Sequence, residues 1–370
     1  MRVPFLDLKT QYSRIKPEIG EAIERVFDSG QFILGPEVRS FEERFAREHR
    51  AAHTIATNNG TSALHLALWA IGVERGDEVI LPVNTFIATA EAILLCGATP
   101  IFVDHDEYYN IDTEQVEGRI TLRTKAIVAV HLYGQAARMD ALKQIADRYG
   151  IALIEDAAQA HLATFDDRFV GSWGNATAFS FYPGKNLGAY GEGGAVITND
   201  SALLEKMLLL RDHGSKSKYQ HVVAGHNYRL EALQAAILNV KLQHLEEWTA
   251  SRRQYATQYG KLLSDCPFIQ IPKEHSQVKS VYHLYVIQAD NRERLLEYLD
   301  RADIGTGLHY PVPLHLQPCF AYLGYKEGAF PCAEASAKRI LSLPMFPELT
   351  EAQVEYVAES IANFYEKEQD

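Results

Sequence analysis

The chain has 370 residues, 47% of them hydrophobic and 23% charged, so it can bury a full core without disulfide or metal staples. Its formal net charge of −12 argues against broad binding to nucleic acid or to an anionic membrane. The four cysteines form no Cys-x-x-Cys pair, so no zinc, iron–sulfur or other metal site and no disulfide framework is expected.

The first residues, Met1–Leu8, become polar too soon for a signal peptide. No apolar run approaches the roughly 18–20 residues that cross a bilayer. We therefore expect a cytoplasmic protein that does not enter a membrane.

Residues 14–29 have the apolar spacing of an amphipathic helix that Gly30 ends, and a second helix is expected after Pro36. From residue 55 onward, short apolar strands alternate with helices, which is typical of βαβ units and a mostly parallel sheet. The strands are expected at residues 78–81, 100–103, 126–131, 151–155, 176–182 and 194–198, and the helices at 61–71, 85–95, 139–149, 201–212 and 229–247.

The pattern becomes more mixed beyond about residue 250, with a strand expected at 282–287 and helices near 292–302 and 351–366. Together with the chain length, this favours a large domain over residues 1–249 and a smaller C-terminal α+β domain over residues 250–370.

The first candidate site residue is Asp156, which directly follows the strand at 151–155. Ligands of open α/β sheets gather beyond the carboxyl ends of strands. An acid there could support the protonated ring nitrogen of pyridoxal 5′-phosphate (PLP), which makes the ring an electron sink. On the strand alone, capping the next helix is the commoner role for such an acid.

The second candidate is Lys185, which a Pro-Gly turn presents after the strand at 176–182. PLP chemistry needs a lysine with a lowered pKa, because the neutral amine binds the cofactor and later moves protons. Taken alone, an ordinary solvated loop lysine is the simpler interpretation.

The third candidate is the start of the helix at 61–71, where Gly60 permits close backbone approach and Thr61 opens the helix with free amides. Such a helix start can bind a phosphate, although it can equally be an ordinary helix cap. The glycine-rich run at 188–194 is not a Walker loop, because Lys185 is followed by Asn186. His309 and His315 lack the spacing of a helical metal pair.

Taken together, these segments resemble the DegT/DnrJ/StrS family of PLP-dependent sugar aminotransferases over nearly the whole chain. Each segment is weak evidence alone, and their order along the chain is what makes the resemblance specific. The matching segments are residues 4–8, 32–38, 59–64, 84–89, 131–134, 155–160, 180–188, 211–214, 225–229, 309–311 and 315–318.

The resemblance implies the fold of PLP-dependent transferases of fold type I, similar to aspartate aminotransferase, with PLP as cofactor. It implies that Lys185 bears the cofactor and carries the proton between Cα and C4′. It further implies that Asp156 supports the ring nitrogen, Gln159 contacts the ring-hydroxyl side and Phe86 stacks on the ring. The phosphate ligands that it implies are Gly60, Thr61 and Ser180.

The family also implies a homodimer with shared active sites. By resemblance, Asn227 reaches the cofactor phosphate of the partner subunit, and Arg229 holds the carboxylate of the amino donor there. His309 and Tyr310 are implied to contact substrate, also from the partner chain.

The implied reaction moves the amino group of L-glutamate to a nucleotide-linked keto sugar, in amino-sugar biosynthesis for lipopolysaccharide or another glycan. The stretch at 181–193 resembles the branch that aminates C3, which favours a dTDP-linked 3-keto-6-deoxyhexose as acceptor. A UDP-linked 3-keto sugar acid and a 4-keto sugar are the alternatives. Glu192 departs from this branch, which often has Asp there.

Two rival functions follow from the same family. PLP-dependent sugar dehydratases replace the lysine, commonly with histidine, or add iron–sulfur ligands, whereas this chain keeps Lys185 and has no cysteine cluster. A regulatory protein built on the fold is disfavoured, because the full set of cofactor residues is present and no DNA-binding extension is visible.

Overall fold

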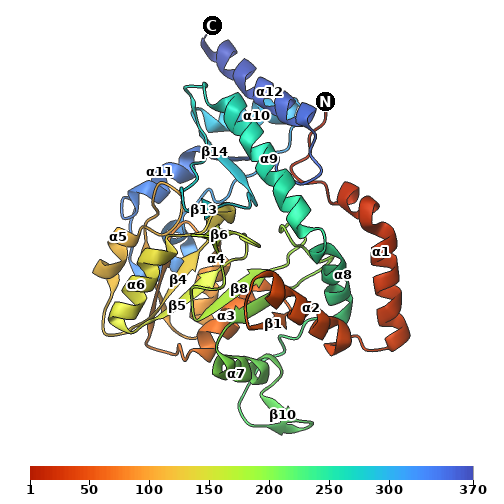
Figure 1. The fold of residues 1–370 in the computed structure, drawn as a ribbon. Coiled ribbons are helices and arrows are strands. Elements are labelled where there is room, and N and C mark those ends of the chain that lie inside the picture. Colours follow the sequence, from red (N-terminus) through yellow and green to blue (C-terminus); the bar gives the residue numbers. More distant parts are fainter. Residues whose placement is uncertain (370) are drawn as a thin grey trace.

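The computed structural model describes residues 1–369, and its centre is a 7-stranded sheet (Figure 1). Its strands are β1 His53–Thr57, β2 Glu78–Pro82, β3 Thr99–Val103, β4 Thr124–Val130, β5 Ala152–Asp156, β8 Ala176–Ser180 and β9 Gly194–Thr198. The order is β1-β9-β8-β5-β4-β2-β3, and β9 alone runs in the opposite direction to the other strands. The expected mostly parallel sheet is confirmed.

Helices cover both faces of this sheet. One face packs against α3 Gly60–Ala70, α4 Ile87–Leu95 and α7 Ser201–Arg211, and the other against α2 Gly35–Glu48 and α6 Met139–Tyr149. Along β2, Val79 and Leu81 belong to the core on the α3 side, whereas Ile80 belongs to the core on the α2 side. Burial on both faces explains why the strands read as continuous apolar runs.

Helix α1 (Leu8–Ser29) packs through Ile15, Ile19 and Val26 against α8 (Ala232–Leu242). The helix begins earlier than expected, because the Asp7 side chain accepts the Thr10 amide at 2.9 Å and caps its first turn. It ends as expected at Gly30, whose positive φ of 63° suits glycine.

A second, smaller core lies beyond α9 (Leu245–Leu263). It contains the sheet strands β12 Ile269–Gln270, β14 Tyr285–Ala289 and β15 Ile340–Leu343, and the helices α10 Arg292–Arg301, α11 Pro331–Arg339 and α12 Glu351–Gln369 flank or cover it. Leu245 packs in the main core and Tyr259 in the second one, so α9 joins the two. A division into residues 1–249 and 250–370 remains our proposal, and its boundary lies inside α9.

The remaining elements are short: α5 Thr113–Val116, a small sheet of β6 Thr164–Phe165, β7 Arg168–Phe169 and β13 Val278–Lys279, and the pair β10 Ser215–Ser217 and β11 Gln220–His221. The β10–β11 pair forms an arm that projects from the sheet domain, at the bottom of Figure 1. Within residues 1–369, no helix has the length and apolarity that a bilayer crossing requires. In the same part of the chain, no cluster of three or more His, Cys, Asp or Glu could hold a metal ion.

Two further element predictions were wrong in their bounds. The single helix expected at 229–247 is two helices, because the chain bends at Gln243 and His244 and α9 then runs on to Leu263. The strand expected at 282–287 begins only at Tyr285, since residues 281–284 bond instead to the loop around Gly134.

Candidate active site

The site lies where β5 and β8 end side by side, since Asp156 pairs with Ala178 in the parallel register. Asp156 is the last residue of β5 and its side chain is buried. Burial raises the pKa of its carboxyl, and hydrogen bonds from Thr89 and Ala158 and the charge of Lys185 act against that rise. A buried, hydrogen-bonded carboxylate at a strand end can hold a proton on a bound heterocycle.

Lys185 follows β8 on a turn in which its own amide donates to the Tyr182 carbonyl at 2.8 Å. Its side chain is half-buried, and burial lowers the pKa of the ammonium to about 8, with the charge of Asp156 opposing that shift. An appreciable fraction of this amine is therefore neutral near physiological pH. A neutral lysine amine is the form that attacks an aldehyde.

The first turn of α3 lies directly against Ser180. A Cβ added at Gly60 would come within 2.7 Å of the Ser180 Cβ, so glycine is what permits this approach. The Asn59 side chain accepts the Ser62 amide at 2.8 Å, and the preceding Gly60 and Thr61 amides have no acceptor within the helix. Asn59 therefore caps the helix through the Ser62 amide and leaves the Gly60 and Thr61 amides free. These two amides and the Ser180 hydroxyl could bind a phosphate.

Phe86 and Gln159 both contact Tyr310, and the charge of Asp156 acts on the Tyr310 phenol. The Phe86 ring is 52% exposed and lies 5.5 Å from the ring of Tyr310, so it offers a flat face for stacking. Gln159 donates from Nε2 to the Tyr310 hydroxyl at 3.2 Å. Its Oε1 accepts the amide of Tyr133 at 2.7 Å, which fixes the orientation of the side-chain amide.

His309 and Tyr310 were expected from the partner chain, whereas the structure places them against residues of their own chain. Within one chain, Tyr310 contacts Phe86 and Gln159, and the His309 carbonyl accepts from the Tyr133 hydroxyl. The segment that leads to them bridges to β15 of the smaller sheet, since the Gly307 amide donates to the Ser342 carbonyl at 3.1 Å. Burial lowers the pKa of His309 to about 4, with the charge of Lys185 adding to the effect, so the imidazole is neutral.

Asn227 and Arg229 are not part of this cluster. Asn227 is exposed, and Arg229 donates to its Oδ1 at 3.0 Å and to Asp212 at 3.1 Å. Tyr228 between them points the other way, since its hydroxyl lies 2.9 Å from His65 Nδ1 on α3. Asn227 and Arg229 therefore lie on the opposite side of the segment from Tyr228, with Asn227 exposed and Arg229 half-buried against Asp212.

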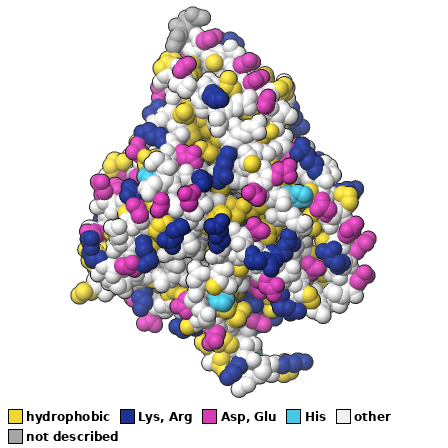
Figure 2. Space-filling model, viewed as in Figure 1, with side chains coloured by type: hydrophobic (Ala, Val, Ile, Leu, Met, Phe, Trp, Pro, Cys, Tyr) yellow, Lys and Arg dark blue, Asp and Glu magenta, His cyan; other side chains and the backbone are white. Residues whose placement is uncertain are grey.

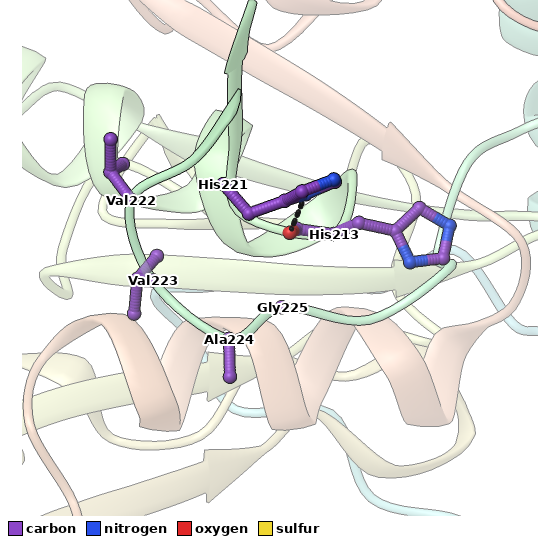
Figure 3. A pocket seen from close by; sticks show the side chains of 6 residues that line it. All are labelled: His213, His221, Val222, Val223, Ala224 and Gly225. Atoms are coloured by element: carbon purple, nitrogen blue, oxygen red, sulfur yellow. Dashed lines mark hydrogen bonds between the residues drawn. The ribbon is translucent and has the colours of Figure 1, made fainter. Parts of the chain in front are cut away.

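A separate hollow of about 550 Å³ lies on the arm, lined by His213, His221 and the segment 222–225 (Figure 3). Its one hydrogen bond in the view joins His221 Nδ1 to the His213 carbonyl at 2.8 Å. Val222 and Val223 are 53% and 42% exposed, so the lining is apolar as well as open. It shares no residue with the cluster around Lys185.

Sequence reasoning missed the side chains that support the cluster. Thr89 donates to Asp156 at 2.7 Å, and His283 Nδ1 lies 3.1 Å from Oδ1 of Asn186, next to Lys185. Thr89 lies close in sequence to Phe86, but nothing in the local sequence marks its contact with Asp156. For His283 we find no signal in the sequence.

A lysine opposite a buried acid at the carboxyl edge of a mostly parallel sheet, with an anion site and a stacking ring beside them, defines a PLP-dependent transferase. The comparisons with known proteins agree. Residues 13–362 match the model of the DegT/DnrJ/EryC1/StrS aminotransferase family, and the chain belongs to this family.

Three relatives show the range of names in the family. A protein of Geobacillus stearothermophilus named pleiotropic regulatory protein is 51% identical, over 99% of both chains. A dTDP-3-amino-3,4,6-trideoxy-alpha-D-glucose transaminase of Streptomyces venezuelae is 44% identical, over 99% of this chain and 97% of its own. A UDP-2-acetamido-2-deoxy-3-oxo-D-glucuronate aminotransferase of Pseudomonas aeruginosa is 42% identical, over 98% and 100%.

Solved structures confirm the fold and the cofactor. DesV of S. venezuelae, crystallised with a ketimine intermediate, has a TM-score of 0.96 at 44% identity, with 98% of both chains covered. NtdA of Bacillus subtilis, solved with its cofactor PMP, has a TM-score of 0.91 at 30% identity, with 98% of this chain and 85% of that chain covered. The chain is thus a PLP-dependent aminotransferase of fold type I, and the residues at the sheet edge fit this cofactor.

Proposed function

We propose that this enzyme transfers the amino group of L-glutamate to C3 of a nucleotide-linked keto sugar, with a dTDP-linked 3-keto-6-deoxyhexose as the favoured acceptor. The observation that carries the proposal is the placement of Lys185 and Asp156 after the adjacent strands β8 and β5, near enough for their charges to interact, in a chain whose relatives include transaminases named for 3-amino and 3-oxo sugars. A UDP-linked 3-keto sugar acid is the second candidate.

In this proposal PLP, when bound, supplies an electron sink for the carbon that loses or gains a proton. The amine of Lys185 takes the proton from one carbon and returns it to the neighbouring one, so a single group serves as base and as acid. Asp156 holds the proton on the ring nitrogen, Gln159 contacts the ring-hydroxyl side, and the Phe86 face stacks on the ring. Gly60, Thr61 and Ser180 hold the phosphate.

The loop that follows Lys185 bears on the choice of carbon. The C4-aminating branch has a Thr-Thr-Gly-Glu run there, whereas this chain has Gly188-Ala-Tyr190. The Tyr190 amide donates to Gln234 Oε1 at 3.0 Å, and the Gly188 carbonyl accepts from Lys241 at 2.5 Å, so α8 holds the loop. Glu192 is exposed and takes no part in these contacts.

An assay of the purified protein with L-glutamate and three sugars tests the choice of acceptor. We expect kcat/KM for a dTDP-linked 3-keto-6-deoxyhexose to exceed that for a 4-keto isomer by at least about 10²-fold, because a polar site rejects a misplaced hydroxyl or carbonyl. A UDP-linked 3-keto sugar acid should lie between them. Turnover of the 4-keto sugar alone would contradict amination at C3.

We also propose a homodimer in which Asn227 and Arg229 of one subunit complete the site of the other. Both lie on the opposite side of their segment from Tyr228, and a guanidinium can bind the glutamate carboxylate in a bidentate manner. The arm carries Lys216 and Lys218 and exposed valines, and Figure 2 shows cationic and hydrophobic side chains at its tip. Such a surface suits contact with a partner subunit and with the phosphates of a nucleotide.

Mixing two inactive variants tests the shared site. Lys185→Ala lacks the lysine of a site, and Arg229→Ala lacks the arginine that the other subunit contributes. A mixed dimer has one intact site, which combines Lys185 of one subunit with Arg229 of the other. After random reassociation we expect activity to recover to about a quarter of the wild-type value, because half of the dimers are mixed and each has one intact site. If Arg229 acts within its own chain, mixing restores nothing.

A cytoplasmic location belongs to the same proposal, since the four cysteines are free, as a reducing compartment allows. The amino sugar formed would serve the synthesis of lipopolysaccharide or another glycan. The regulatory name of the 51%-identical relative describes no chemistry, and the presence of Lys185 and Asp156 favours an enzyme.

A further inference from the structure

Two buried threonines stand behind Asp156. The Thr89 hydroxyl donates to Oδ2 of Asp156 at 2.7 Å, and the Thr85 hydroxyl lies 2.9 Å from that of Thr89. Thr89 is 1% exposed and Thr85 is 3% exposed, so water competes for neither contact. The other oxygen of Asp156 accepts the amide of Ala158 at 3.1 Å.

The direction of these bonds follows from the number of protons. An ionised carboxylate only accepts, so Thr89 must give its single hydroxyl proton to Asp156. Thr89 can then only accept from Thr85, which fixes a chain of donation from Thr85 through Thr89 to Asp156. Consecutive hydrogen bonds of this kind strengthen one another.

The same segment positions the ring-stacking residue. Thr85 and Thr89 flank Phe86 at the start of α4, and the buried threonines and the exposed Phe86 ring point to different sides. One short segment therefore contacts both the acid for the ring nitrogen and the face on which the ring would stack. Thr89 and Phe86 are three residues apart in sequence, so no long loop separates the contact to Asp156 from the stacking ring.

We propose that Thr89 is a positioning residue for Asp156: its hydroxyl fixes the carboxylate and keeps it ionised, and so sets how firmly the protein holds a proton on the ring nitrogen of PLP. This inference rests on the proposed role of Asp156. It assigns to Thr89, with Thr85 behind it, a function in cofactor binding that neither the motif nor the fold by itself implies.

The charges around Asp156 agree with this role. Burial raises the pKa of the carboxyl, and the Thr89 hydrogen bond is the largest influence that lowers it, ahead of the Ala158 amide, Lys185 and His131. Tyr310 faces the same carboxylate, whose charge helps to raise the pKa of the phenol, so Tyr310 stays neutral. Without the Thr89 hydroxyl, the equilibrium between ionised and protonated Asp156 shifts toward the protonated form. A protonated carboxyl cannot accept the proton of the ring nitrogen.

The test is Thr89→Val, which removes the hydroxyl at nearly constant volume, with Thr89→Ser as the variant that restores it. We expect the dissociation constant of PLP, measured by equilibrium dialysis against the apoprotein, to rise about 10- to 100-fold in Thr89→Val and to stay near wild type in Thr89→Ser. The pH at which bound PLP loses its ring proton, followed by visible absorbance, should fall by about one unit in Thr89→Val.

Thr177→Val is the matched control. Thr177 is also buried and donates to a buried carboxylate, Glu155, at 3.0 Å, one residue before Asp156. We expect it to lower thermal stability without changing the PLP dissociation constant or the absorbance titration. Should Thr89→Val fail to fold, Thr89→Ala carries the same test, because it removes the hydroxyl and adds no atom.

Two results would overturn the proposal. One is wild-type PLP affinity and titration in folded Thr89→Val, and the other is equal weakening in Thr177→Val, which would mean a general loss of stability. Asp156→Asn in the same assays separates this proposal from the one on which it rests. If Asp156→Asn loses PLP affinity and Thr89→Val does not, only the role of Thr89 fails; if neither does, the role of Asp156 fails with it.

Discussion

Replacing Lys185 by alanine is expected to lower the rate of amino transfer by at least about 10⁴-fold, because the variant loses both the nucleophile that takes up PLP and the group that moves the proton. No other lysine is placed to take over these two roles of Lys185. Burial lowers the pKa of Lys185 to about 8, against the opposing charge effect of Asp156. No other lysine lies at the ends of β5 and β8.

Lys241→Met is the matched control for this prediction. Burial lowers the pKa of Lys241 to about 8 as well, but its amine donates to the Gly188 carbonyl and lies 4.8 Å from the Tyr190 ring. A lowered pKa alone therefore does not distinguish the two lysines, whereas the contacts do. We expect Lys241→Met to lose stability and to retain the glutamate half-reaction, measured by the absorbance of bound cofactor. Retention of that half-reaction in Lys185→Ala would contradict the assignment.

Replacing Asp156 by asparagine is expected to reduce the rate of the glutamate half-reaction by about 10²- to 10⁴-fold, because an amide cannot hold the proton on the ring nitrogen. The change should also act on Lys185. The carboxylate raises the pKa of Lys185, so its removal should move that pKa below about 8.

The rate of PLP uptake by the apoprotein measures this coupling. Uptake needs the neutral amine, so the rate should rise with pH through about 8 in the wild type and through a lower pH in Asp156→Asn. Thr85→Val, which leaves the carboxylate in place, should keep the midpoint closer to that of the wild type. An unchanged midpoint and an unchanged half-reaction in Asp156→Asn would show that this acid does not face the cofactor.

The parts of the fold with a strong local pattern could be predicted from the sequence. The strands around Ile80 and Ile154 are short apolar runs between helices, and Met139–Tyr149 has helical spacing with Gly150 at its end. These elements depend on their own residues, so their existence was predicted correctly. The bend at Gln243 could not be predicted, because no glycine or proline marks it and it depends on the two cores that α9 joins.

In the site, too, residues with a local sequence signal could be predicted, and contacts between distant segments could not. Asp156 and Lys185 were candidates because each follows a strand, and the resemblance to a family was needed to predict them, with Phe86, Gln159 and Ser180, as site residues. The contact between Thr89 and Asp156 joins residues 67 positions apart, and no local pattern encodes it. The contact between Tyr310 and Gln159 of the same chain joins residues 151 positions apart, so no local pattern encodes it either.

The central claim is that Lys185 bears PLP in an enzyme that accepts an amino group from glutamate. The most direct measurement is reduction of the PLP-loaded protein with sodium borohydride, which fixes the cofactor on the lysine that holds it, followed by mass spectrometry of the peptides. The account predicts label on Lys185, and loss of that label when L-glutamate is added before reduction. Label on Lys241 or on another lysine, or label that glutamate does not remove, would contradict it.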